Sequence, residues 1–168
     1  FFVAFKLPNF FRRLFAEGAF NAAFVPLFTG RLAADGKSAA RDFAAEVLSV
    51  MVVTLFFFVT LLQIAMPVVM LGFAPGFAAD PEKFDLTVEL ARITFPYLLF
   101  ISLVSHLGGV LNSLGRFAAA AATPILLNVF LIGALTGFAS TAATPGHALA
   151  YGVVAAGIVQ FLFLIVAC

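Results

Sequence analysis

The sequence predicts an all-α, polytopic membrane protein on the basis of three observations. Apolar residues make up 64% of the 168 residues, charged residues only 10%, and the mean hydropathy is +1.16, whereas about 25% of a soluble domain is charged. Apolar runs of about 20 residues, the length that spans a bilayer as a helix, recur along the chain. Runs such as VMVVTLFFFVTLL at 50–62 do not alternate between apolar and polar residues, which excludes membrane β-strands.

Five helices and no soluble domain are predicted. Their expected ranges are about 1–32, 41–73, 84–114, 117–139 and 146–168. Turn-forming sequences separate them, namely ADGKS at 34–38, APGFAADPEK at 74–83, NSLGR at 112–116 and TAATPG at 141–146. Because these loops are short, successive helices are expected to be antiparallel. Proline lacks a backbone N–H, so four prolines within or near helix ends are expected to bend their helices: Pro8, Pro67, Pro96 and Pro124.

The cations of the loops predict the orientation of the chain in the membrane. Arg31, Lys37 and Arg41 lie in or beside the first loop, and Arg116 lies in the third. The second loop is acidic apart from Lys83. Cytoplasmic loops are enriched in Lys and Arg. We therefore expect the first and third loops to be cytoplasmic and the first helix to run from outside to inside.

Several classes of function are excluded. The net charge is +1 and the cations are scattered, so no nucleic-acid partner is expected. The single cysteine, Cys168, rules out an internal disulfide and a cysteine-based metal site. No glycine-rich nucleotide loop occurs. We expect no cofactor and no metal site in this chain.

Polar residues within the predicted spans do not indicate an enzyme. Ser102 and His106 could suggest a serine protease, but both rise from one helix and no oxyanion-hole motif accompanies them. His106 is therefore expected to be a hydrogen-bond partner between helices. The same role is expected for the amide side chains of Gln63, Asn112, Asn128 and Gln160. Gly133 and Gly137 form a GxxxG pair that predicts close helix packing.

Both ends of the sequence lie within apolar runs. The chain begins at Phe1 without an initiator Met or a signal peptide, and it stops in IVQFLFLIVAC at 158–168 without flanking charges. We expect the chain to be a fragment of a longer membrane protein.

The first predicted helix carries more charge than lipid tolerates. Lys6, Arg12, Arg13 and Glu17 would together cost roughly 10–14 kcal/mol at the centre of a bilayer, whereas the Phe, Leu and Val residues of 1–28 recover roughly 4–8 kcal/mol. The segment therefore either lies along the membrane surface or faces a wet cavity in a helical bundle. The cavity is favoured, because an ionisable residue at membrane depth usually serves a function.

Helical spacing distinguishes the two arginines. Lys6, Arg13 and Glu17 fall within about 40° of one another, and Arg13 and Glu17 form an i,i+4 pair. Arg12 points about 100° away and has alanine, not an acid, four residues on. A guanidinium holds two phosphate oxygens at once. We therefore predict that Arg12 binds an anionic ligand, with Asn9 one turn earlier adding an amide contact.

Four stretches of the sequence resemble the MurJ (MviN) family of bacterial lipid II flippases. They are FFVAFKLPNFFRRLFAEGAFNAAFVPLF at 1–28, APGF at 74–77, ITFPYLLFISL at 93–103 and LNSLGRF at 111–117. The similarity extends along the whole chain and is densest in the first 28 residues. The resemblance implies a MATE-like bundle of the multidrug/oligosaccharidyl-lipid/polysaccharide (MOP) exporter superfamily. The intact protein would have fourteen helices, of which this chain would supply the second to the sixth.

The resemblance also implies a function and a site. In that family a cationic, V-shaped cavity moves lipid II, the undecaprenyl-diphosphate-linked peptidoglycan precursor, from the inner to the outer leaflet of the bacterial inner membrane by alternating access. The arginine matching Arg12 is needed there, and Asn9, Arg13, Glu17 and Lys6 match the same block. Further cationic residues and a sodium site lie in helices outside this chain, so any coupling to a monovalent ion would reside there.

Three other interpretations remain open from the residues alone. One is an exporter of another polyprenyl-linked glycan, and a second is a MATE-type multidrug antiporter, both of the same superfamily. An antiporter of organic cations would place carboxylates in its cavity, whereas the one deep carboxylate, Glu17, has a cation one turn away. The third is a structural membrane scaffold whose RRLFAEG segment lies flat on the surface.

Overall fold

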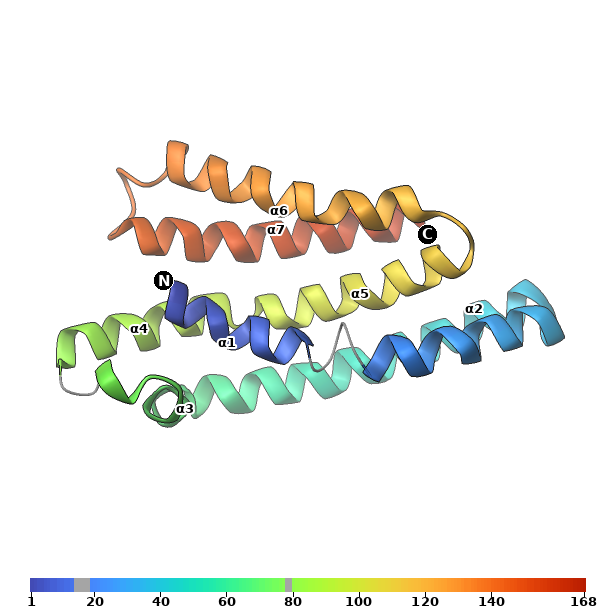
Figure 1. The fold of residues 1–168 in the computed structure, drawn as a ribbon, viewed down its shortest axis with the longest axis horizontal. Coiled ribbons are helices and arrows are strands. Elements are labelled where there is room, and N and C mark those ends of the chain that lie inside the picture. The colour runs from blue at the N-terminus through green and yellow to red at the C-terminus, as the bar shows by residue number, and fades with distance from the viewer. Residues whose placement is uncertain (14–18, 78–79) are drawn as a thin grey trace.

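In the computed structural model, the described residues, 1–13, 19–77 and 80–168, form helices and no strand, which confirms the all-α prediction. The elements are α1 (Phe2–Arg12), α2 (Ala19–Ile64), α3 (Met66–Phe73), the short 3-10 helix η2 (Pro75–Phe77), α4 (Pro81–Thr94), α5 (Tyr97–Ser113), α6 (Phe117–Gly137) and α7 (Pro145–Ala167). Most of these helices run along the long axis of an elongated bundle (Figure 1).

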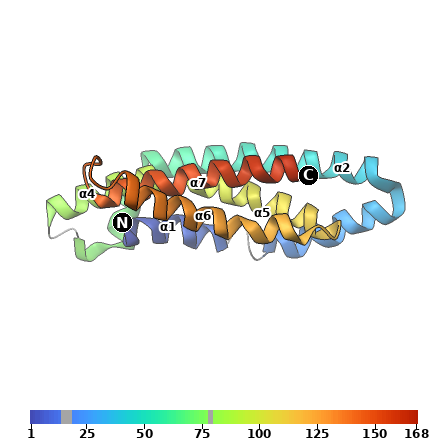
Figure 2. The ribbon, with the colours of Figure 1, turned by 90° about the horizontal axis from the view of Figure 1, so that it is seen from above.

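Helix α2 is a helical hairpin that doubles back at Gly36. This residue has φ +82° and ψ −176°, a conformation that glycine adopts without a steric penalty. The two halves of α2 lie side by side in both views (Figures 1 and 2). Phe24 and Phe28 of the first half pack against Ala40 and Phe43 of the second. The loop expected at 34–38 is thus reduced to one non-helical residue, because glycine alone supplies the reversal.

Prolines account for two breaks that the expected ranges 41–73 and 84–114 did not contain. α2 ends at Ile64, and α3 follows with Pro67 in its first turn. α4 ends at Thr94, and α5 begins at Tyr97 after Pro96. A proline cannot donate the hydrogen bond of a helix interior, so the chain bends there. In contrast, Pro8 and Pro124 lie within α1 and α6.

The start of α4 is set by Asp80, which caps the helix. Its carboxylate accepts a hydrogen bond from the backbone N–H of Lys83 at 3.3 Å and forms an ion pair with the Lys83 ammonium at 2.8 Å. These hydrogen bonds from Lys83 lower the pKa of Asp80. An acidic cap also complements the helix dipole. The helix therefore begins at Pro81, three residues before the expected 84.

Glycines of α7 allow its close packing against two other helices. A Cβ atom at Gly152 would lie 2.7 Å from the Cβ of Ala134 in α6, and one at Gly157 would lie 2.8 Å from the Tyr97 ring in α5. The GxxxG pair of α6 does not have this role, because no atom of the described residues lies within 4 Å of a Cβ built at Gly133 or Gly137. Which glycines face a neighbouring helix depends on helix rotation, which the GxxxG spacing does not specify.

Polar side chains connect the helices as predicted. The His106 ring contacts the carbonyl oxygen of Ala44 through Nε2 at 3.1 Å, and Gln160 donates to the carbonyl of Thr123 at 2.6 Å. Gln63 donates to the carbonyl of Arg92 at 2.8 Å. The interhelical role is thereby confirmed for these three residues. Asn128 is exposed and has no hydrogen bond to another described residue.

The bundle has the long apolar helices and the exposed apolar surface of a multi-pass membrane protein. Four helical stretches are long and apolar enough to cross a membrane: 20–64, which doubles back at Gly36, 81–113, 117–137 and 145–167. One exposed stripe of large apolar residues on α2 consists of Val50, Val53, Phe57, Leu61 and Ile64. The reversal of α2 and the α5–α6 turn lie at one end of the bundle, and the α6–α7 loop lies at the other (Figures 1 and 2).

Candidate functional site

Arg12 lines a partly polar cavity of about 260 Å³ between α2, α5, α6 and α7. α1 carries this residue at its last position, and the side chain is half-buried with its Nε atom enclosed. The polar residues that line the cavity with it are Asn21, Ser105, Asn112 and Thr123. No described carboxylate lines it. We refer to this space as the Arg12 cavity.

A hydrogen bond between helices forms one wall of the Arg12 cavity. The Asn21 amide of α2 donates to the Ser105 hydroxyl of α5 at 3.0 Å. Gly109 lies beside this contact, and a Cβ atom added there would lie 3.1 Å from the side-chain Oδ1 of Asn21. The absence of a side chain at Gly109 therefore gives the Asn21 amide its position.

One face of α5 supplies half of the lining. Its residues recur at intervals of three and four, the period of a helix face, and are Ile101, Val104, Ser105, Gly108, Gly109 and Asn112. Ser105 and Asn112 lie seven residues apart, two helical turns, so both present polar groups to one space. This spacing is present in the sequence, from which Asn112 was expected to contact another helix. Ser105, Asn21 and Thr123 were not predicted for the site.

The other residues predicted for the site lie elsewhere wherever the structure describes them. Lys6 is exposed and lines a separate cavity of about 280 Å³ beside Phe73 and Phe77. Lys6 lies six residues before Arg12, so the two side chains are separated by about 240° of rotation around the helix. Arg13 is exposed and Asn9 half-buried, and neither lines the Arg12 cavity. Glu17 lies outside the described residues.

Arg12 also has a partner of its own within the chain. The prediction that Arg12 binds an anionic ligand therefore has to allow for this interaction. A ligand at this guanidinium would share or replace the existing interaction.

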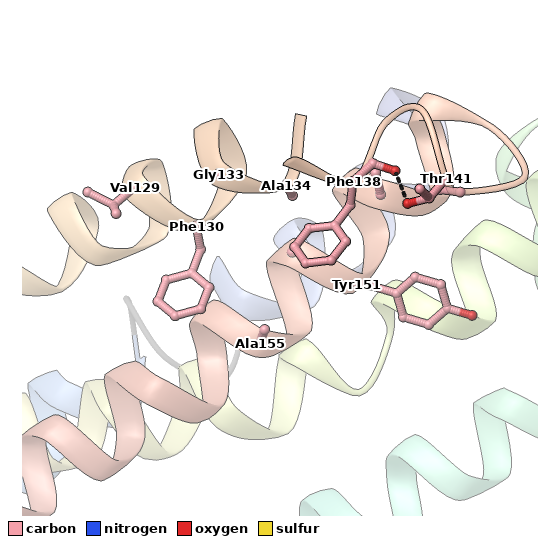
Figure 3. A pocket seen from close by; sticks show the side chains of 11 residues that line it. Val129, Phe130, Gly133, Ala134, Phe138, Thr141, Tyr151 and Ala155 are labelled. Carbon is pink, nitrogen blue, oxygen red and sulfur yellow. Dashed lines mark hydrogen bonds between the residues drawn. The ribbon is translucent and has the colours of Figure 1, made fainter. Parts of the chain in front are cut away.

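Another cavity of about 650 Å³, between α6 and α7, has a different chemistry. Figure 3 shows Phe130, Phe138 and Tyr151 around it, and the Thr141 hydroxyl donates to the Phe138 carbonyl at its rim at 3.2 Å. No charged residue lines this cavity. It offers hydroxyl groups but no cation to a phosphate, whereas the Arg12 cavity combines a guanidinium with amide and hydroxyl groups.

Metal binding has no support among residues 1–13, 19–77 and 80–168. No three His, Cys, Asp or Glu side chains in these ranges come together to hold an ion. The chemistry of the Arg12 cavity is thus that of cationic and neutral donors.

Comparison with known proteins shows which family the chain belongs to. The sequence model of the family described as "Lipid II flippase MurJ" matches residues 1–168. The chain belongs to the MurJ family. A probable lipid II flippase MurJ of Rhizobium tropici is 48% identical over 164 residues, which are 95% of this chain and 31% of that protein. The lipid II flippase MurJ of Burkholderia cenocepacia is 40% identical over 166 residues, 96% of this chain and 31% of that protein.

The chain spans about a third of the length of these MurJ relatives. The family match covers all of α1 to α7, and so includes each residue that lines the Arg12 cavity. The resemblance first observed in the sequence is thereby confirmed over the whole chain.

Proposed function

We propose that the protein to which this chain belongs translocates lipid II from the inner to the outer leaflet of the bacterial inner membrane. The observation that carries the proposal is a MurJ-family chain with an arginine in a partly polar cavity that no described carboxylate lines. The proposed transport breaks no covalent bond of the substrate. What this chain contributes is a binding surface.

In this proposal Arg12 binds the diphosphate of the substrate. Its guanidinium can place two N–H groups on one phosphate, and Asn112 and Asn21 border the same space and can add amide donors. The polyprenyl tail stays in the surrounding lipid. Alternating access then follows from rocking of this bundle against the remainder of the protein, with the site between them. Coupling to a monovalent ion is assigned to helices outside this chain.

The chemistry of the Arg12 cavity argues against the multidrug antiporter. A cavity for organic cations needs carboxylates, and no described residue lining this one has a negative charge. An exporter of a different polyprenyl-diphosphate glycan would share the phosphate-binding step, so it differs from our proposal only in the sugar that is carried.

The proposal also specifies which end of the bundle faces the cytoplasm. The end with the α2 reversal and the α5–α6 turn carries Lys37, Arg41 and Arg116, as expected of a cytoplasmic end. After Cys168→Ser removes the one cysteine of this chain, we expect Lys37→Cys to resist an impermeant thiol reagent added to intact cells. Glu82→Cys in the acidic loop is the matched control and is expected to react. Labelling of Lys37→Cys from outside would reverse the orientation.

Rescue of a flippase-depleted cell tests the function itself. Expression of the full-length protein is expected to restore growth to a bacterium depleted of its lipid II flippase, because the same lipid-linked precursor would be carried. Colony formation and cell shape are the measurements. If the protein is present in the membrane at normal abundance and the cells still lyse, the proposed substrate is wrong.

A further inference from the structure

A further cavity, of about 860 Å³, lies at the cation-rich end of the bundle, apart from the Arg12 cavity. Three cations from two turns line it: Lys37 and Arg41 follow the α2 reversal, and Arg116 precedes α6. No described carboxylate lines it, and none of the three cations forms an ion pair with another described residue. We call this space the basic cavity.

The helical face of α2 explains why the cations converge there and the nearby acids do not. The lining residues of this segment recur at the period of a helix face and are Lys37, Ala40, Arg41, Ala44, Ala45 and Leu48. Asp42 and Glu46 each lie one position, about 100° of rotation, beyond a lining residue and do not line the cavity. The charge facing this space is therefore positive.

Most of the other residues that line the basic cavity are apolar. Leu32 and Phe28 of α2, Leu107 of α5 and Ile165 of α7 line it. His106, whose side chain is fully buried, fixes the wall by contacting the Ala44 carbonyl at 3.1 Å. A backbone carbonyl only accepts hydrogen bonds, so Nε2 is the donor in this contact. A ligand that uses the whole lining therefore combines an anionic group with hydrocarbon.

We propose that the basic cavity binds an anionic phospholipid, with the headgroup phosphate at Lys37, Arg41 and Arg116 and part of an acyl chain along the apolar wall. A soluble phosphate would use the cations but leave the apolar wall in contact with water, which is unfavourable. A zwitterionic lipid would bring a cation of its own to three unneutralised positive charges. The cavity therefore selects lipids with net negative headgroups.

The test measures lipid binding by the purified full-length protein with native mass spectrometry. Phosphatidylglycerol is the probe, and phosphatidylcholine and inorganic phosphate are the comparisons. Each juxtamembrane cation contributes about fivefold to the affinity for an anionic lipid, so Arg41→Gln with Arg116→Gln is expected to weaken phosphatidylglycerol binding about 25-fold. Both arginines are exposed, so the fold does not depend on them.

The matched control is Arg31→Gln with Lys83→Gln, which removes the same charge outside the cavity. Neither residue lines the basic cavity. Arg31 lies over the Phe43 ring, 4.7 Å from its centroid, and Lys83 forms an ion pair with Asp80. Binding by this control is expected to stay within twofold of the original. The proposal is overturned if both double variants lose the lipid equally. It is also overturned if phosphatidylcholine binds as tightly as phosphatidylglycerol, or if inorganic phosphate displaces the lipid at equal concentration.

Discussion

Replacement of Arg12 with alanine in the full-length protein is expected to abolish lipid II flipping. Two hydrogen bonds from the guanidinium to a phosphate each contribute about 1.5–3 kcal/mol, so their loss weakens substrate binding by about 100-fold or more. Arg12→Lys keeps the charge but not the planar pair of donors. Lysine is therefore expected to restore activity only in part. The measurements are growth of cells with the variant as sole flippase and the appearance of lipid II in the outer leaflet.

The control for this series is Arg31→Ala. Arg31 is an exposed arginine that lies over the Phe43 ring and does not line the Arg12 cavity. Its replacement is expected to leave flipping unchanged, which separates loss of a specific contact from loss of positive charge. Normal growth of the Arg12→Ala strain would contradict the role that we assign to this residue, even if rescue by the original protein succeeds.

Substitution of Gly152 with alanine is expected to destabilise the protein by about 1–3 kcal/mol, the usual cost of overpacking. The added Cβ would lie 2.7 Å from the Cβ of Ala134, which is fixed to the α6 backbone and has no rotamer to change. α6 and α7 must therefore separate locally. Thermal unfolding of the full-length protein in detergent is the measurement, and a lower midpoint is the expected result.

The control here is Gly133→Ala on the facing helix. No described residue of another helix lies within 4 Å of a Cβ at Gly133, and alanine favours a helix over glycine by about 1 kcal/mol. We expect this variant to be at least as stable as the original protein. Equal stability of the Gly152→Ala and Gly133→Ala variants would contradict the close packing of α6 against α7 at Gly152.

Element type could be predicted from the sequence, whereas several breaks could not. Long apolar runs can satisfy their backbone hydrogen bonds in lipid only as helices, so the helical class needed no tertiary information. Pro67 and Pro96 marked the bends, but a proline also occurs within α6 at Pro124, where the helix continues. Whether a proline ends a helix depends on which neighbours satisfy the released carbonyl groups, and those neighbours are not local in sequence.

Of the residues that line the Arg12 cavity, only Arg12 was predicted for the site from the sequence. The others were identified from the structure. The charge cost of the first helix drew attention to its ionisable residues, and helical spacing then selected Arg12 because alanine, not an acid, lies four residues on. Asn21, Ser105 and Asn112 were not selected as its neighbours. Asn21 and Ser105 are 84 positions apart, and their hydrogen bond exists only because α2 and α5 lie side by side.

Composition and local spacing by themselves determined the helical membrane class of this protein and the segment most costly to place in lipid, because each of these follows from the interaction of a short segment with its solvent. Only the tertiary structure decided which side chains surround Arg12, which glycines allow close packing, and that Lys37, Arg41 and Arg116 line one space. Those features depend on the rotation and pairing of helices, which are set by contacts between residues distant in the chain.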